Sequence, residues 1–168
     1  MSSDENVIVS ENAPVAVGAY PHARRIGDFV FLSGVGPRQP ITNDIPGGAI
    51  KDKDGNPLDY DIRAQTEACI LNIEAILKSS GAELGDIVDV TSFLINMDRD
   101  FEGYNEVYAR FFTNIQATRT TLAISALPTP IAVEMKVIAN FAYTNEKTGC
   151  WRKEIAFDMC DGTCGEDS

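Results

Sequence analysis

The chain has 168 residues, and 14 Lys and Arg against 25 Asp and Glu give it a formal charge of −11 when its one histidine is neutral. This length fits one domain, and with 44% hydrophobic residues the chain can bury a core that needs no disulfide or metal. The composition excludes a disulfide scaffold and, for the bulk of the chain, disorder. The acidic balance argues against a nucleic-acid partner, because proteins that bind phosphate backbones cluster Lys and Arg.

The N-terminal sequence carries no recognisable targeting signal. Residues 1–6 lack the positive and apolar regions of a signal peptide. No apolar stretch approaches the roughly 18 residues of a membrane span. We therefore expect a cytoplasmic protein without a membrane partner.

The first elements in the chain are a predicted hairpin and a long loop. Two extended runs, 20–26 and 28–33, meet at Gly27 and Asp28, a pair typical of tight hairpin turns. Residues 36–59 are rich in Pro, Gly, Asn and Asp and are too many for a simple connection. A loop of this length is usually a lid, a binding loop or a disordered insertion.

A helix is predicted after this loop. Asp59 or Asp61 can cap its N-terminus, and Gly81 can end it. Its apolar residues recur at helical spacing. They are Ile62, Cys69, Ile73, Ile76 and Leu77.

The second half of the chain alternates strands with one more helix. Residues 87–95 are rich in β-branched side chains and predict a strand, and Asp98 or Asp100 can cap the helix that follows. The last strands are expected at 120–124 and 132–141. The order is ββαβαββ, which predicts an α+β sheet with two helices on one face. The second helix presents Phe101, Tyr104, Tyr108, Phe111 and Phe112 on one side.

The last predicted strand has one apolar face and one mixed face. Alternation places one set of side chains on one face: Val133, Met135, Val137, Ala139 and Phe141. The other face carries Glu134, Lys136, Ile138 and Asn140. Two helices can cover only one face, so the opposite face needs water or another subunit. A symmetric oligomer with facing sheets is the natural solution.

The hydrophobic pattern ends near residue 143. We therefore divide the chain into a domain at 1–143 and a C-terminal tail at 144–168. The tail carries Cys150, Cys160 and Cys164, whose spacing lacks the two-residue separation of most zinc knuckles. We expect exposed thiols there, with a disulfide or a structural metal as the alternatives.

Standard catalytic signatures are mostly absent from the sequence. It contains no phosphate-binding loop, no nucleophile elbow and no zinc-protease motif. The single histidine, His22, excludes a site with several histidine ligands, and we expect it to be a packed or surface group rather than a base.

Arg119 and Glu134 are the most informative charged residues. Arg119 starts an apolar strand, where a permanently charged guanidinium is costly unless it holds an anion. Glu134 lies on the polar face of the following strand. From the residues alone, a structural ion pair between the two is at least as good an interpretation as a functional site.

Five short motifs add a family resemblance over about residues 13–142. They are APVAVGAY at 13–20, FLSG at 31–34, AQTEACILNI at 64–73, NEVYARFF at 105–112, and TRTT, LP and VE between 118 and 134. In this order and spacing they resemble the reactive intermediate deaminase (RidA or YjgF) family. The resemblance implies a chorismate mutase-like fold, a homotrimer with active sites between subunits, and hydrolysis of amino-acid enamines and imines without metal or organic cofactor.

The resemblance also implies roles for individual residues. Arg119 would bind the substrate carboxylate, because a guanidinium offers two parallel donors. Glu134 would position or deprotonate water. The remaining pocket residues would be Tyr20, Ser33, Gly34, Asn105, Thr121 and Lys136. Thr121 stands where many members carry Cys, and Lys136 stands where many carry Glu, which adds a positive charge near the site.

Within the family, four motifs most resemble the 2-aminomuconate deaminase branch: GAYPHARR at 18–25, DIRAQT at 61–66, NM at 96–97 and FEGYNEV at 101–107. That branch converts 2-aminomuconate to 2-oxohex-3-enedioate (4-oxalocrotonate) and ammonia. The alternatives are a general 2-iminopropanoate and 2-iminobutanoate deaminase, or a non-catalytic trimer that binds a small carboxylate. RNA cleavage, also linked to the family, fits poorly with a charge of −11.

A dicarboxylate such as 2-aminomuconate needs a second cation besides Arg119. The candidates are Lys136, Arg24, Arg25 and Arg38. For any one of these four, solvated surface charge is the simpler interpretation.

Overall fold

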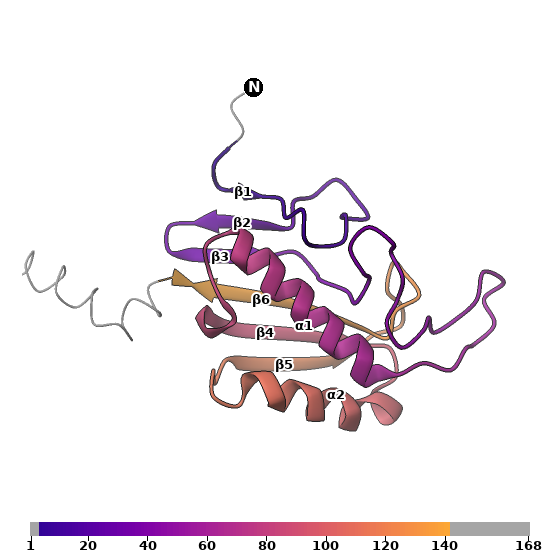
Figure 1. The fold of residues 1–168 in the computed structure, drawn as a ribbon. Helices are drawn as coiled ribbons and strands as arrows, with labels where there is room; N and C mark the ends of the chain where they lie inside the picture. The colour runs from indigo at the N-terminus through magenta and orange to yellow at the C-terminus, as the bar shows by residue number, and fades with distance from the viewer. Residues whose placement is uncertain (1–3, 142–168) are drawn as a thin grey trace, which may run out of the picture.

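The computed structural model describes residues 4–141, in which two helices cover one face of a six-stranded sheet (Figure 1). The strands are β1 (Val7–Ile8), β2 (Ala23–Ile26), β3 (Phe29–Leu32), β4 (Ile87–Leu94), β5 (Thr118–Ala123) and β6 (Val133–Asn140). The helices are α1 (Ile62–Ser79) and α2 (Met97–Phe112), with a short 3-10 turn, η1 (Leu84–Asp86), before β4. The predicted α+β class is confirmed. The predicted ββαβαββ order omitted β1, because two residues are too few to show alternation.

The order of the strands across the sheet is β1-β2-β3-β6-β4-β5. β4 and β5 run parallel, joined by α2, and every other neighbouring pair is antiparallel. β5 is therefore an edge strand and β6 is a central one. The strands that carry Arg119 and Glu134 are not neighbours, since β4 lies between them.

The helix ends follow from local capping. Asp61 caps α1 by accepting from two backbone N–H groups of the first turn, and Gly81, at φ +82°, follows the C-cap residue Ser80. The cap of α2 is Asn96, so the expected cap at Asp98 or Asp100 is wrong. Asp98 and Asp100 both lie in the first turn of α2, where a negative charge interacts favourably with the helix dipole. Aspartate is therefore favoured both at the N-cap and in the first turn, and the residue type alone does not tell these two positions apart.

The core lies between the two helices and the sheet. In β6, Val133, Met135, Val137 and Ala139 are buried, as their alternation predicts, while Lys136 is exposed on the opposite face. This opposite face, called the open face below, also carries large apolar side chains with substantial exposure. They are Phe29, Phe31 and Leu122.

The loop at 36–59 is tied to α1 by two polar side chains that the core encloses. Gln65 Nε2 donates to the Gly48 carbonyl at 2.7 Å, and its Oε1 accepts from the Ala132 amide at 2.7 Å. Asn72 Nδ2 donates to the Gly36 and Arg38 carbonyls at 2.9 and 2.8 Å. These buried amides fix the loop backbone at residues 36, 38 and 48, so this part of the loop is not a disordered insertion.

The tail at 144–168, with Cys150, Cys160 and Cys164, lies outside the described residues. In the part that is described, Cys69 is a buried free thiol, and no cluster of three or more His, Cys, Asp or Glu could hold a metal ion. Neither helix of this part has the length and apolar character that crossing a bilayer requires.

Candidate active site

Arg119 lies on the helix-covered face of β5. Its partner in the register is Val90 of β4, which is fully buried, and residues opposite each other on neighbouring strands share a face. Arg119 Nη1 donates to Oδ1 of Asn105 on α2 at 2.7 Å. The guanidinium therefore has a neutral hydrogen-bond partner, and its positive charge is not cancelled by it.

Three aromatic rings of α2 surround the same guanidinium. Its central carbon is 4.6 Å from the centroid of the Tyr108 ring, 5.6 Å from that of Tyr104 and 5.9 Å from that of Phe101. Burial raises the pKa of Tyr104 and brings that of Tyr108 to about 12, so both hydroxyls stay neutral. Cation–π attraction in this aromatic cradle (Phe101, Tyr104 and Tyr108) orients Arg119 without neutralising it.

An open depression lies beside Arg119. Its lining residues are Met97, Asp98, Phe101, Glu102, Arg119 and Thr121. A carboxylate entering here would meet guanidinium donors that are already oriented, which is the arrangement that favours two-point binding. Asn105 and Thr121, both expected at the site, thus lie with Arg119.

Glu134 lies on the open face of β6. Its register partner is Phe93, three residues along β4 from Val90 and therefore on the other side of the sheet. Desolvation raises the pKa of this half-buried carboxyl, and within residues 4–141 no hydrogen bond or ion pair stabilises it. An unpaired, partly desolvated carboxylate is a poor structural element and a good proton acceptor.

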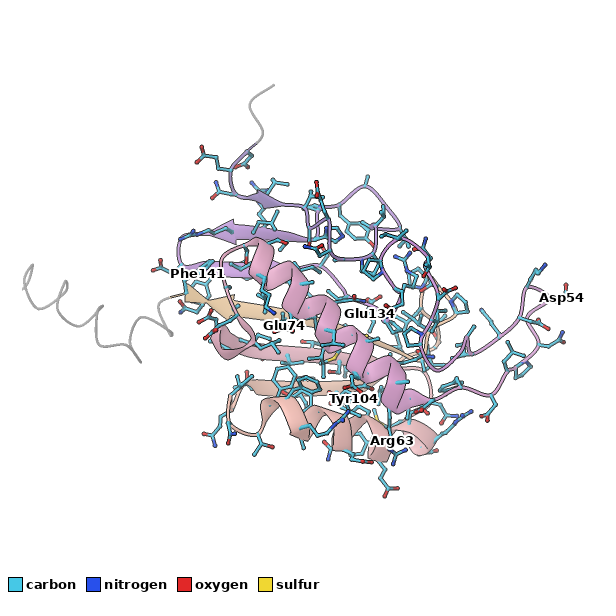
Figure 2. All side chains as sticks on the ribbon, viewed as in Figure 1. Asp54, Arg63, Glu74, Tyr104, Glu134 and Phe141 are labelled. Atoms are coloured by element: carbon cyan, nitrogen blue, oxygen red, sulfur yellow. The ribbon has the colours of Figure 1, made fainter. Side chains whose placement is uncertain are left out.

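Gly34 packs directly against Glu134. A Cβ atom at residue 34 would lie 2.8 Å from the Glu134 Cδ, closer than real contacts allow. A side chain at residue 34 would therefore force the Glu134 carboxylate to shift from this position. Figure 2 shows Glu134 and Phe141 towards opposite ends of β6, so Glu134 lies near the start of this strand.

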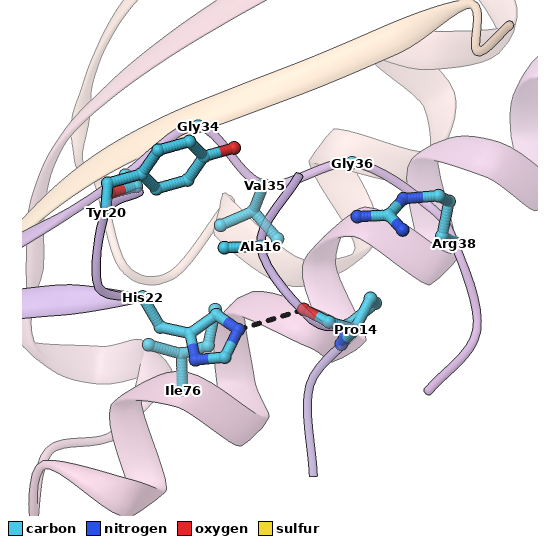
Figure 3. A pocket seen from close by; sticks show the side chains of 10 residues that line it. Pro14, Ala16, Tyr20, His22, Gly34, Val35, Gly36, Arg38 and Ile76 are labelled. Carbon is cyan, nitrogen blue, oxygen red and sulfur yellow. Dashed lines mark hydrogen bonds between the residues drawn. The ribbon is translucent and has the colours of Figure 1, made fainter. Parts of the chain in front are cut away.

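A cavity adjoins Gly34, and Tyr20 and Ser33 line it together with the loop residue Arg38 (Figure 3). The Ser33 hydroxyl donates to the Pro21 carbonyl at 2.7 Å, so its first role is to shape the turn before β2. The residues expected at the site thus form two groups. Tyr20, Ser33, Gly34 and Glu134 form one, and Arg119, Asn105 and Thr121 form the other.

The two groups do not meet within one chain. Arg119 and Glu134 lie on opposite faces of the sheet, so the structural ion pair considered from the sequence is wrong. Lys136, two residues from Glu134, projects from the same open face opposite Thr91.

The other three candidate cations differ sharply in position. Arg24 pairs with Asp4 at 3.4 Å on the outer part of the sheet. Arg25 donates to the Gly27 carbonyl at the hairpin turn. Arg38 alone among these three arginines lines the cavity with Tyr20. Its position depends on the folding of the loop, which no local pattern reveals.

The aromatic cradle was missed as a functional feature, although its residues were predicted to share a helix face. The helical spacing of residues 101, 104 and 108 indicates a buried stripe, which is the usual role of such residues. The contact between Arg119 of β5 and these rings joins residues that are distant in the sequence, so helical spacing does not reveal it. Asn105, which lies next to the stripe in the sequence, is the signal that could have suggested a site there.

Comparisons with known proteins show the family of this chain. The family model described as Endoribonuclease L-PSP matches residues 10–141. A 2-iminobutanoate/2-iminopropanoate deaminase of Escherichia coli is 32% identical over 135 residues, which is 79% of this chain and 94% of the relative. A RutC family protein of Pyrococcus abyssi is 37% identical, covering 80% of this chain and 96% of the relative.

Two solved structures show the same fold. RidA from an Antarctic Psychrobacter is 29% identical with a TM-score of 0.69, covering 80% of this chain and 98% of its own. Escherichia coli TdcF with bound serine is 32% identical with a TM-score of 0.67, covering 80% and 97%. The resemblance to RidA and YjgF proteins is confirmed, and the chain belongs to the Endoribonuclease L-PSP family.

Proposed function

We propose that this protein is a cofactor-independent deaminase that hydrolyses imines or enamines of 2-oxo acids. The observation that carries the proposal is the pair of half-sites: an arginine whose charge is left available, and a half-buried glutamate without a partner. The activity named for the Escherichia coli relative supports the same chemistry.

We infer that a complete site needs two subunits. Arg119 and Glu134 cannot reach one substrate across their own sheet, whereas a second copy can bring its Arg119 to the open face. Phe29, Phe31 and Leu122 on that face would be covered by the same contact. A homotrimer, as the family resemblance implies, supplies three equivalent sites in a closed ring.

The chemistry follows from the two charges. Arg119 holds the substrate carboxylate and so fixes the neighbouring C=N carbon near Glu134 of the other subunit. Glu134 takes a proton from water as its oxygen bonds to that carbon. This proton passes to the imine nitrogen, which gives a carbinolamine. Glu134 then takes the proton of the new hydroxyl group and passes it to the amine nitrogen as C=O forms and the C–N bond breaks, so that ammonia and a 2-oxo acid leave.

Two rival functions fit the same features less well. A trimer that merely binds a small carboxylate would need Arg119 but not an unpaired glutamate, whose desolvation costs stability. Cleavage of RNA, which the family description suggests, would place a polyanion against a chain with a charge of −11.

The carboxylate-binding role of Arg119 is tested by Arg119→Lys. Lysine keeps the charge but loses the planar pair of donors, so kcat/KM for 2-iminopropanoate generated in situ should fall at least about 100-fold. Arg110→Lys, on the exposed side of α2, is the matched control and should leave kcat/KM within about twofold. Equal activity of both variants would remove Arg119 from the site.

The role of Glu134 gives a pH dependence with a defined sign. Burial raises its pKa above the ordinary value of 4.5, and the carboxylate is the active form. Activity should be full at neutral pH and fall as the pH drops through that raised pKa. Glu134→Gln should bind a carboxylate inhibitor normally and lose turnover. Any residual activity should no longer fall as the pH drops through this range. Unchanged turnover would make Glu134 structural.

For the substrate itself, we propose 2-aminomuconate over 2-iminopropanoate, because the loop places Arg38 in the cavity beside Tyr20. Arg38 Nη1 donates to Asn43 Oδ1 at 2.7 Å, and Nη2 donates to the Val15 carbonyl at 2.8 Å. A guanidinium held in this way keeps donors for a second carboxylate.

Arg38→Ala should therefore reduce kcat/KM for 2-aminomuconate by at least about 30-fold, on the order of 2 kcal/mol, and affect 2-iminopropanoate little. Asn43→Ala removes the loop contact but keeps the guanidinium, so it controls for disturbance of the loop. A wild-type preference for 2-iminopropanoate, or equal losses with both substrates, would favour the general imine deaminase.

A further inference from the structure

We propose that His22 is a positioning residue: its neutral imidazole holds the segment 10–20, and with it Tyr20, against the cavity, and protonation of the ring releases that segment. The consequence for turnover rests on the proposed deaminase function. The structural effect of protonation does not, and it can be measured separately.

The two hydrogen bonds of His22 define its protonation state. Nδ1 accepts from the Ser10 backbone N–H at 2.9 Å, so this nitrogen carries no proton. Nε2 lies 2.9 Å from the Pro14 carbonyl oxygen, which can only accept, so Nε2 carries the proton (Figure 3). The site therefore selects one neutral tautomer, and both ring nitrogens bridge to the same short segment.

Apart from the His22 ring, the segment is anchored by Ser10 and Ala13, which are buried, and by a few polar contacts. It has no regular secondary structure between β1 and β2, and Val15 and Val17 are 76% and 51% exposed. The Ser10 hydroxyl contacts Ser79 Oγ at 2.9 Å, and the Val15 carbonyl accepts from Arg38. The His22 ring thus contributes two of the few contacts that hold the cavity wall, and such weakly anchored segments open locally at low cost.

Pro14, Ala16 and Tyr20 connect the segment to the site, because all three line the cavity that adjoins Gly34. Displacement of the segment would widen this cavity and move Tyr20 away from Gly34. Glu134 would keep its place, since it belongs to β6. We therefore expect weaker substrate binding, a KM effect, rather than a direct effect on the proton transfer.

A protonated imidazole cannot make both bonds. Both of its nitrogens are donors, so the Ser10 N–H would face another donor and lose its partner. The charged side chains around the ring are Glu11 and Arg38, which line the cavities that His22 also lines, and Tyr20 is the nearby phenol. On α1 the ring faces Ile76, while Glu74 and Lys78 pair with each other at 2.8 Å. Protonation therefore favours the released segment, and the neutral ring favours the closed one.

Since the chain has a single histidine, imidazole resonances in an NMR titration report on His22 alone. In the full-length protein we expect the Nε2–H tautomer at neutral pH. Once the imidazolium form appears on acidification, amide exchange of Ser10 and its neighbours to residue 20 should be faster, after correction for intrinsic rates. The opposite tautomer, or an imidazolium form without any change in this segment, would overturn the proposal.

Three variants separate the two bonds. In His22→Asn the side-chain oxygen can replace Nδ1 as acceptor from the Ser10 N–H, and in His22→Gln the side-chain NH2 can replace Nε2 as donor to the Pro14 carbonyl. His22→Leu retains neither bond. At neutral pH, His22→Leu should speed exchange in residues 10–20 at least about tenfold, with His22→Asn and His22→Gln in between, and the pH dependence of exchange should vanish in all three. Asn12→Ala, a neighbouring surface change, should leave exchange unchanged.

The kinetic readout is kept apart from the structural one. The three variants should raise KM for 2-iminopropanoate in the order of their exchange rates. The fall of kcat at low pH, which we assign to Glu134, should be the same in the variants as in the wild-type protein. Faster exchange without any KM effect would overturn the positioning role. If the wild-type protein shows no deaminase activity, the exchange data still decide whether His22 fixes the segment, and the proposed function fails by itself.

Discussion

The register of β4 with its two neighbours is the constraint on which the site depends. Val90 is opposite Arg119, Phe93 is opposite Glu134, and the odd spacing between the two β4 residues sends their partners to different faces. No side-chain rotation brings Arg119 and Glu134 together through a sheet. The same hydrogen bonds that build the core therefore place the two charges on opposite faces, and the proposed chemistry needs a second subunit to bring them to one substrate.

The energetics of the two charges agree with this division. Arg119 is held by an amide oxygen and by aromatic rings, which orient a cation without neutralising it. Glu134 has lost part of its solvation and gained no cation. A protein that needed only stability would pair or replace such groups. In the described part of the chain, Arg119 and Glu134 both lack an oppositely charged partner, as expected if Arg119 binds the substrate and Glu134 binds the reacting water.

The sequence predicted what depends on local spacing. The α1 cap, expected at Asp59 or Asp61 and found at Asp61, the end near Gly81 and the alternation of β6 follow from short-range patterns. The family motifs identified Arg119 and Glu134, but their separation to opposite faces depends on which strands pair. The His22 tautomer and the place of Arg38 likewise depend on contacts between distant segments, which residue types do not encode singly.

The most direct test of the shared site is a mixture of two inactive variants. Arg119→Ala and Glu134→Gln should each abolish turnover, and co-expression in equal amounts should give hybrid trimers. If each site takes Arg119 from one subunit and Glu134 from the next, about one site in four is intact, and roughly a quarter of wild-type activity returns. If both residues act within one chain, no intact site can form, and the absence of any recovery would contradict the account.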